Sequence, residues 1–286
     1  MRSVGIAAKI TSESALQFAT NVANDLRRRG IEVCFDDATG TAIGDTGSCT
    51  TRAELGNRTN LLMTFGGDGT LLSVARHAPD HVPILGVNMG TLGFLTEIRV
   101  EEFPAVLERV LAGNFLVEPR ATFNAKVTGP GRDGQEYRVL NDIAINKSAL
   151  ARIIEINVKV AGQFVSTFRG DGLIVSTPTG STAYSLSAGG PIVYPTMNAM
   201  ILTPICPHML SNRPLVLPDE LDIDISVKSP SGDQEIYVTL DGQEGTPLTQ
   251  QDRVCVRKSD EPVLLIQSPD KNYFDVLRTK LKWGEW

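Results

Sequence analysis

The sequence predicts two domains of different fold class, an α/β N-terminal domain built on a parallel sheet and an all-β C-terminal domain built as an antiparallel sandwich. The first third of the chain alternates short apolar runs with helical patterns, which is typical of a parallel sheet. After Pro119 the apolar residues recur at every second position, which is typical of half-buried antiparallel strands. A chain of 286 residues is long enough for both domains.

The N-terminal domain, residues 1–118, is predicted to be Rossmann-like. Apolar residues with helical spacing between Ala15 and Leu26 predict a helix that ends near Gly30. We expect residues 40–58, which are rich in Gly, Thr and Ser, to form a mobile loop with a short helix. The predicted strands are the apolar runs at 4–8, 31–35, 61–65 and 82–87, and a polar-faced helix is predicted at 101–111.

The C-terminal domain, residues 119–267, is predicted to be all-β. Turn sequences at 129–131, 162–163 and 230–233 separate its alternating runs. The predicted strands lie at 123–127, 154–160, 221–227 and 236–240. Residues 268–286 have helical spacing and no partner of their own, so they would pack on another element.

Composition excludes several classes of function. The net charge of −6 argues against a nucleic-acid or anionic-membrane surface as the main partner. No apolar run approaches the roughly 20 residues of a membrane span, and no signal peptide is visible. The four cysteines are far apart and the three histidines form no metal pattern, so we expect no disulfide, no zinc site and a cytoplasmic location.

The most informative motif is the glycine loop Gly66-Gly67-Asp68-Gly69-Thr70, which follows the apolar run 61–65. Glycine lets the backbone approach a ligand closely, and the start of the following helix favours anions. A single carboxylate beside phosphates is placed to take a proton from a hydroxyl or to help hold a metal. The alternative is a tight strand-to-helix turn with a solvated aspartate.

The loop resembles that of the NAD kinases, and more loosely those of diacylglycerol and sphingosine kinases and of phosphofructokinase. Further motifs follow in the order found in the NAD kinases, and together they span the chain from about residue 60 to residue 245. They are the second glycine loop at 85–95, Asn141-Asp142, the long segment 169–191, Thr203–His208 and Leu240-Asp241-Gly242-Gln243.

The resemblance implies phosphorylation of the 2′-hydroxyl of the adenosine ribose of NAD by ATP, with Asp68 as the catalytic acid–base group. It also implies Mg²⁺ or another divalent cation with ATP, no metal held by the protein alone, a homodimer or homotetramer with shared sites, and a tail, 268–286, that returns to the N-terminal domain. The implied ligand-binding residues are Gly66, Gly67, Asp68, Gly69, Asn141, Asp142, Arg152, Arg169, Asp171, Thr182, Ala183, Tyr184, Ser185, Ser187 and Gln243.

The residues themselves support these roles but leave alternatives open. The small side chains around Thr182 leave room for a flat ring, on which Tyr184 can stack, but a Gly/Ser loop between domains has the same composition. Asn141 and Asp142 can bridge ribose hydroxyls or simply end a strand. Arg152 could equally be an ordinary surface arginine.

One position departs from the family pattern. Several family members have a basic residue near the donor phosphates five positions after the catalytic aspartate, and this chain has Ser73 there. How the donor charge is met is therefore open, as is the choice between ATP and polyphosphate. The other functional readings are a lipid kinase with the same loop, and a non-catalytic NAD-binding sensor, which would not need Asp68.

Overall fold

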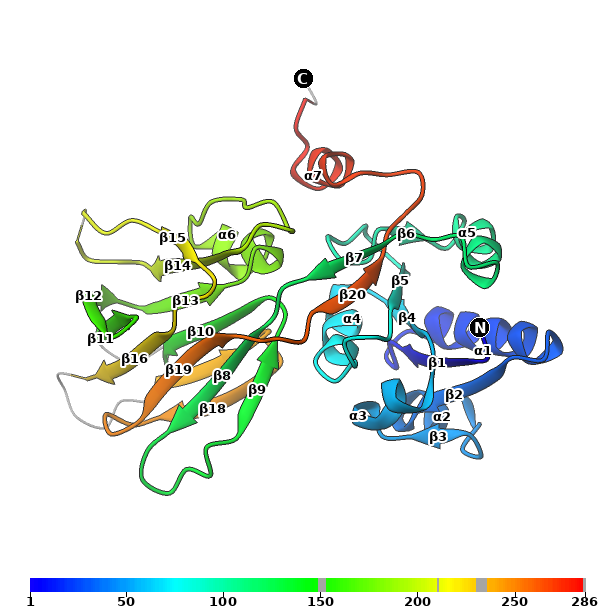
Figure 1. Ribbon diagram of the computed structural model, residues 1–286, viewed down its shortest axis with the longest axis horizontal. Helices are drawn as coiled ribbons and strands as arrows, with labels where there is room; N and C mark the ends of the chain where they lie inside the picture. Colours follow the sequence, from blue (N-terminus) through cyan, green and yellow to red (C-terminus); the bar gives the residue numbers. More distant parts are fainter. Residues whose placement is uncertain (149–152, 210, 230–235, 285–286) are drawn as a thin grey trace. The chain divides into compact units, whose positions relative to one another are not determined.

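The computed structural model describes residues 1–148, 153–209, 211–229 and 236–284. The chain divides into two compact units (Figure 1). The first unit comprises Met1–Pro119 and Val263–Trp286, and the second comprises Arg120–Pro262. The chain therefore returns to the first unit at Val263 and not at residue 268, because the strand that begins there pairs with the sheet of the first unit.

The sheet of the first unit has the strand order β3-β2-β1-β4-β5-β20-β7, with β6 also paired to β5. The pairs from β3 to β20 along this order are parallel, as is the pair of β5 with β6. Its strands are β1 (Ser3–Ala8), β2 (Glu32–Asp36), β3 (Cys49–Thr50), β4 (Leu62–Gly66), β5 (Ile84–Asn88), β6 (Ile98–Arg99), β7 (Val117–Arg120) and β20 (Val263–Ile266).

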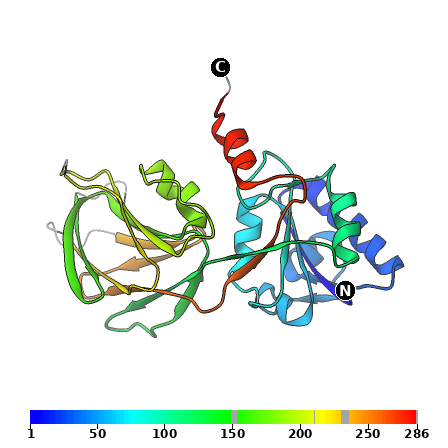
Figure 2. The same ribbon diagram turned by 45° about the horizontal axis from the view of Figure 1, so that its top comes forward.

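Helices lie on both faces of this sheet (Figure 2). Apolar residues of α1 and α5 share a core with alternate residues of the central strands, whereas a side chain at Gly5 of β1 would meet Leu55 of α3 on the other face. The helices of the unit are α1 (Glu13–Arg28), α2 (Asp37–Ile43), α3 (Arg52–Leu55), the 3₁₀ turn η1 (Gly56–Arg58), α4 (Asp68–Ala75), α5 (Phe103–Leu111) and α7 (Tyr273–Leu281).

The prediction for residues 40–58 was wrong in part. The segment contains the end of α2, strand β3, helix α3 and a 3₁₀ turn, so it is more regular than a loop with one short helix. Strand β3 has two residues, and it forms because Phe35 and Cys49 are paired in the sheet. Such a short strand depends on its neighbour and carries no periodicity that a sequence pattern could detect.

The second unit contains two antiparallel sheets of six strands each, with the orders β15-β14-β13-β10-β17-β18 and β12-β11-β16-β19-β8-β9. Its strands are β8 (Phe123–Thr128), β9 (Glu136–Val139), β10 (Asp142–Lys147), β11 (Ile154–Val160), β12 (Gln163–Gly170), β13 (Gly172–Ser176), β14 (Ala199–Ile205), β15 (Leu215–Pro218), β16 (Ile223–Lys228), β17 (Ile236–Leu240), β18 (Glu244–Leu248) and β19 (Arg253–Lys258). Between β13 and β14 lie the 3₁₀ turn η2 (Thr179–Thr182) and the one-turn helix α6 (Tyr184–Ser187).

One apolar core joins the two sheets of the second unit. It takes Ile143 and Leu173 from one sheet and Ile156 and Ile225 from the other, all almost completely buried. Alternation of buried and exposed residues along β11 and β16 gives the period of two seen in the sequence. The predicted fold class is therefore confirmed for both units, while the predicted turn at 230–233 lies outside the described residues.

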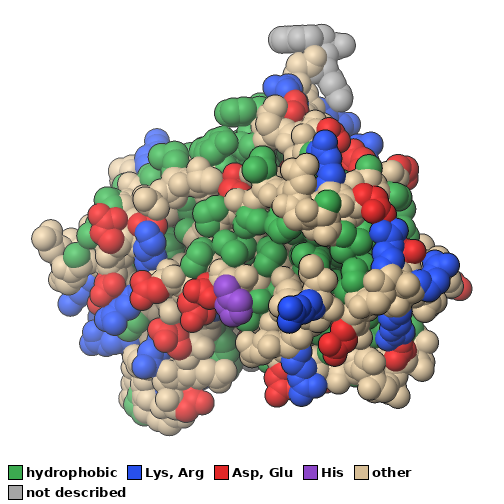
Figure 3. Space-filling view, turned by 45° about the vertical axis from the view of Figure 1, so that its right-hand side comes forward, with side chains coloured by type: hydrophobic (Ala, Val, Ile, Leu, Met, Phe, Trp, Pro, Cys, Tyr) green, Lys and Arg blue, Asp and Glu red, His purple; other side chains and the backbone are tan. Residues whose placement is uncertain are grey.

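On the face shown in Figure 3, acidic and basic side chains are interspersed rather than gathered by sign. None of the helices in the described part of the chain combines the length and the apolarity that crossing a bilayer requires.

Candidate active site

The glycine loop joins strand β4 to helix α4 in the first unit. The strand ends at Gly66, Gly67 caps the helix in extended conformation, and Asp68 is the first helical residue. A Cβ at Gly66 would clash with the side chain of Thr70, so the first glycine is required by a close approach within the loop itself. The loop lies at the carboxyl end of a central parallel strand, where open α/β sheets bind their ligands.

Asp68 is held by a second loop, between β5 and β6. Its Oδ1 accepts hydrogen bonds from the backbone N–H groups of Leu95 (3.2 Å) and Thr96 (2.9 Å) and from the Thr96 hydroxyl (2.8 Å). Its Oδ2 accepts one, from the N–H of Phe94 (2.8 Å). The carboxylate is therefore fixed in orientation, and Oδ2 keeps an acceptor position for a further hydrogen bond.

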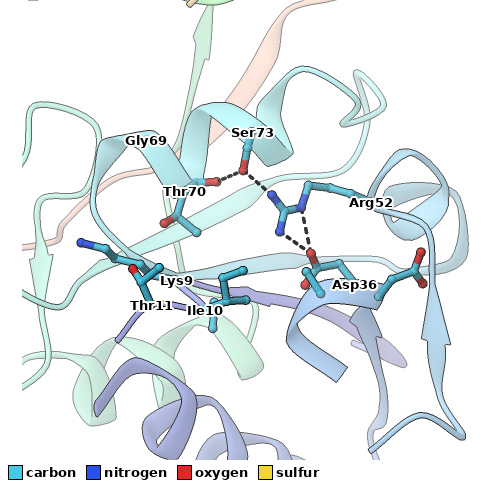
Figure 4. A pocket seen from close by; sticks show the side chains of 11 residues that line it. Lys9, Ile10, Thr11, Asp36, Arg52, Gly69, Thr70 and Ser73 are labelled. Carbon is cyan, nitrogen blue, oxygen red and sulfur yellow. Dashed lines mark hydrogen bonds and ion pairs between the residues drawn. The ribbon is translucent and has the colours of Figure 1, made fainter. Parts of the chain in front are cut away.

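A pocket of about 500 Å³ opens beside the glycine loop (Figure 4). Ser73 on α4 donates from its hydroxyl to the carbonyl of Thr70 (2.7 Å) and accepts from Nη1 of Arg52 (2.8 Å). Arg52 is itself paired with the buried carboxylate of Asp36. Arg52 of α3 thus places a guanidinium group beside Ser73, the position at which several family members have a basic residue. The pocket is lined by Ala8, Lys9, Ile10, Thr11, Asp36, Asp37, Ala38, Arg52, Gly69, Thr70 and Ser73.

Lys9 supplies a second cation at this pocket. It directly follows β1, and its backbone N–H donates to the carbonyl of Phe65 (2.8 Å), which fixes the chain beside the glycine loop. Its side chain is exposed, and within the described ranges its ammonium group has no hydrogen-bond or ion-pair partner. An unpaired ammonium beside the pocket is available to an anionic ligand.

In the second unit, Asn141 directly precedes strand β10 and Asp142 begins it. Beside them lies Asp241, which belongs to the motif at 240–243 but was not among the predicted ligand-binding residues. Asp241, in the turn after β17, accepts hydrogen bonds from the N–H groups of Leu140 (3.1 Å), Asn141 (2.7 Å) and Asp142 (3.2 Å). Asp241 has a φ of +50°, a left-handed conformation that aspartate tolerates better than most residues. Its position before Gly242 in a turn between two strands is the signal that could have identified it.

Asp142 is almost fully buried, with 5% of its surface exposed. Burial, followed by the negative charge of Asp241, raises the pKa of Asp142 to about 7, and the N–H of Tyr184 opposes that rise by donating to the carboxylate. A carboxyl group with this pKa is protonated in about half of the molecules at neutral pH, so it can donate a hydrogen bond as well as accept one.

Tyr184 lies beside these acids at the start of α6. The residue is 41% exposed, and its hydroxyl donates to Oδ1 of Asn146 (3.3 Å). Burial, together with the charges of Asp142, Cys206 and Asp171, raises the pKa of the Tyr184 hydroxyl. The hydroxyl therefore remains protonated at physiological pH, and the exposed part of the ring is open to stacking.

The turn before Tyr184 packs directly on the Asn141 backbone. A Cβ at Gly180 would clash with the carbonyl of Asn141, which explains why the turn needs glycine there. Ser185 is fully buried and its hydroxyl shares a hydrogen bond with Thr203 (2.8 Å). The Ser185 hydroxyl is thus used inside the unit, and a contact of Ser185 with the dinucleotide stays a prediction.

The remaining predicted residues of this turn are partly exposed. Thr182 donates from its hydroxyl to the carbonyl of Thr179 (3.3 Å), and Ala183 has an irregular backbone conformation. Ser187 is exposed at the end of α6. Their predicted contacts with the dinucleotide stay predictions.

The other predicted ligand contacts are distributed along the second unit. Asp171 joins β12 to β13, and its carboxylate pairs with Lys147 (3.5 Å). Arg169 pairs with Glu155 on the neighbouring strand (3.1 Å). Gln243 follows Asp241 in the turn before β18, where its N–H donates to Leu240, and Arg152 lies outside the described residues.

No group of three or more His, Cys, Asp or Glu side chains among the described residues is arranged to hold a metal ion. All four cysteines are free thiols.

The comparisons with known proteins cover nearly the whole chain. Residues 4–115 match the model of the ATP-NAD kinase N-terminal domain, and residues 140–268 match that of the ATP-NAD kinase C-terminal domain. An NAD kinase of Syntrophotalea carbinolica is 47% identical over 286 residues, and one of Trichlorobacter lovleyi is 46% identical over 286 residues. Both alignments cover 100% of each protein.

Two solved structures are similar to this one. A yeast NADH kinase in complex with NADH has a TM-score of 0.88 and 25% identity, over 100% of this chain and 89% of that chain. An NAD kinase from Archaeoglobus fulgidus in complex with ATP has a TM-score of 0.76 and 26% identity, over 98% of this chain and 99% of that chain. The chain therefore belongs to the NAD kinase family.

Proposed function

We infer that this chain transfers a phosphoryl group from ATP to the 2′-hydroxyl of the adenosine ribose of NAD, which gives NADP. The observation that carries the proposal is the carboxylate of Asp68, held in one orientation in the glycine loop that borders the pocket of about 500 Å³, in a chain that matches NAD kinases from end to end. The yeast relative was solved with NADH and the archaeal one with ATP, which supports a dinucleotide acceptor and a nucleotide donor.

Asp68 is proposed to orient the acceptor hydroxyl and accept its proton through Oδ2. Phosphoryl transfer needs little covalent chemistry from the protein, because positioning and charge stabilisation supply most of the rate enhancement. A carboxylate fixed by four hydrogen bonds meets the positioning requirement. Asn141, Asp142, Asp171 and the segment from Thr182 to Ser187 of the second unit are proposed to bind the dinucleotide.

The donor phosphates are proposed to occupy the pocket beside α4. Lys9 would meet them as a mobile point charge, and Arg52, fixed by Asp36 and Ser73, would supply the cation that the sequence lacks at position 73. A divalent cation would arrive with the phosphates as part of the nucleotide substrate, since the described side chains offer no cluster to hold it alone.

We further propose that the protein is a cytoplasmic homo-oligomer. Four free thiols favour a reducing compartment. The edge strands of the two antiparallel sheets need protection, and symmetric self-association is a common solution. A lipid kinase is disfavoured because the matching relatives are NAD kinases over their full length, and a binding sensor is disfavoured by the intact and oriented Asp68.

The test is a coupled assay of NADPH formation with purified protein, NAD, ATP and Mg²⁺. NADP formation that requires both NAD and ATP supports the proposal, and parallel reactions with NADH and with polyphosphate define the acceptor and the donor. Binding of NAD without any NADP formation would favour the sensor. Phosphorylation of diacylglycerol in place of NAD would favour the lipid kinase.

A further inference from the structure

The two oxygens of the Asp68 carboxylate have unequal surroundings. Oδ1 accepts three hydrogen bonds, all from Leu95 and Thr96, whereas Oδ2 accepts one, from Phe94. Oδ1 is therefore committed to the protein, and Oδ2 retains the capacity to accept a substrate proton. Of the four donors only the Thr96 hydroxyl belongs to a side chain, so it is the one that substitution can remove.

The direction of the Thr96 hydroxyl is set by Asn88, the last residue of β5. The Asn88 Oδ1 accepts from the N–H of Gly90 (2.7 Å), and its Nδ2 donates to the carbonyl of Thr91 (2.8 Å), so the two ends of the amide are assigned. Nδ2 also donates to the Thr96 hydroxyl (2.9 Å). Because that hydroxyl accepts from Asn88, its single proton is free to point at Asp68 Oδ1 (2.8 Å).

The two side chains that lead to the acid are buried. Asn88 is 3% exposed and Thr96 is completely buried. Hydrogen bonds in such surroundings are stronger than in water, and successive bonds in a chain polarise one another. The series of hydrogen bonds from Asn88 through the Thr96 hydroxyl thus ends on one oxygen of Asp68. Asn88 and Thr96 lie 20 and 28 residues from Asp68 along the sequence.

We propose that Thr96, oriented by Asn88, is a positioning residue for phosphoryl transfer. It locks Oδ1 of Asp68 so that Oδ2 is the oxygen presented to the acceptor hydroxyl. The proposal rests on the proposed role of Asp68. Thr96 contacts no reacting atom itself, so its removal is expected to affect turnover rather than the binding of either substrate.

The first variant is Thr96→Val, which keeps the shape and the backbone N–H but removes the hydroxyl. We expect kcat to fall about tenfold or more, since a hydrogen bond to a charged group is lost, while KM for NAD and for ATP stay within about threefold. Thr96→Ser restores the hydroxyl and should recover most of kcat. Thr59→Val is the matched control, because Thr59 is also buried and donates to a backbone carbonyl, that of Leu55.

The second variant displaces the carboxylate without removing any hydrogen-bonding group. A Cβ at Gly93 would clash with Oδ1 of Asp68 and with the Thr96 hydroxyl, so Gly93→Ala should push the acid out of place and lower kcat about 100-fold. Gly47→Ala is the control, because a Cβ at Gly47 meets nothing within 4 Å. The thermal unfolding midpoint of each variant shows whether it is folded at the assay temperature.

The decisive measurement is a double-mutant cycle. If Thr96 acts through Asp68, Thr96→Val should cost no further turnover in an Asp68→Asn background. Additive losses, a wild-type kcat for folded Thr96→Val, or no recovery with Thr96→Ser would each overturn the positioning role. Failure of the wild-type protein to form NADP would instead overturn the proposed function, so the two failures are distinguishable.

Discussion

Asp68 in the first unit and Asp142 in the second are both candidate site acids, yet their surroundings are opposite. Asp68 is partly exposed and accepts four hydrogen bonds from one loop. Asp142 is buried, lies near the like charge of Asp241 and receives one backbone N–H, from Tyr184. The same side chain is therefore an oriented acceptor in one unit and a carboxyl group near half-protonation in the other.

This difference between the two acids predicts different functional roles for the two units. A carboxylate surrounded by donors is suited to hold a fixed position during a reaction. A carboxyl group whose pKa lies near neutrality can donate to an acceptor on a ligand, as a permanently ionised group cannot. We therefore expect changes in the first unit to alter turnover and changes in the second unit to alter dinucleotide affinity or stability.

The largest effect is expected from Asp68→Asn. Turnover should fall by about 10²–10⁴-fold, the usual range for loss of a general acid–base group, while the dissociation constant for NAD stays within about tenfold. Steady-state kinetics and calorimetric NAD titration measure the two quantities. Near-normal turnover would exclude the acid–base role, and a large loss of NAD affinity would make Asp68 a binding residue and remove the contrast between the units.

Asp142 predicts a pH dependence of stability. Its folded-state pKa of about 7 lies above the ordinary value of 3.8, so the folded protein binds the proton more tightly than the unfolded chain does. The stabilisation that protonation provides is complete below about pH 4 and is lost as the pH rises through about 7. From pH 4 to pH 8 the loss is at most about 4 kcal/mol, at 1.36 kcal/mol per pKa unit.

Asp142→Asn should remove most of this dependence. Asparagine keeps the shape and cannot ionise, so the free energy of unfolding should change less between pH 5 and pH 8 than in the wild type. Urea unfolding at both values measures it, with the exposed Asp260→Asn as the control. An unchanged pH dependence in the Asp142 variant would mean that the carboxyl group does not titrate in this range.

The sequence predicted local features of these sites well and long-range ones poorly. The glycine loop was predictable because an apolar strand, three glycines and a helix follow one another directly. The partners of Asp68 lie 26 to 28 residues away, and nothing in their spacing indicates that they meet it. Arg52 was missed for the same reason, since only the fold places it beside Ser73.

One error and one unforeseen contact have a different origin. The buried hydrogen bond of the Ser185 hydroxyl was not foreseen, because in a one-turn helix the sequence does not show which hydroxyl is buried. The return of the chain to the first unit at Val263 was placed too late, because β20 is four residues long and its apolar pattern fits either unit. Both depend on tertiary packing that overrides local pattern.

Lys9→Met should raise KM for ATP by about tenfold, because a charge-assisted contact to the donor phosphates is lost while the apolar stem is kept. KM for NAD should change little. The exposed Lys159→Met on β11 of the second unit is the control. Equal changes in KM for ATP and KM for NAD would mean that Lys9 does not act on the donor alone. Arg52 would then be the remaining cation in that pocket to bind the donor phosphates.

The proposed oligomer predicts partial complementation. Asp68→Asn and Asp171→Ala each damage a different unit, so subunits that exchange into mixed dimers with shared sites would hold one intact site per mixed pair. Random mixing should restore about a quarter of the wild-type activity. Light scattering measures the assembly state in parallel, and a fully active monomer at the assay concentration would contradict both the shared site and the oligomer.

The smallest effect is expected from Tyr184→Ala. Loss of stacking by the exposed part of the ring should raise KM for NAD roughly threefold, since aromatic stacking contributes about 0.5–1.5 kcal/mol beyond burial. Tyr184→Phe removes only the hydrogen bond to Asn146 and should leave KM for NAD nearly unchanged. Because Tyr184 belongs to the second unit, kcat should stay within about twofold of the wild type in both variants. A lower kcat with an unchanged KM for NAD would show that turnover depends on the second unit as well. That result would contradict the expectation that the first unit governs turnover and the second unit governs dinucleotide affinity.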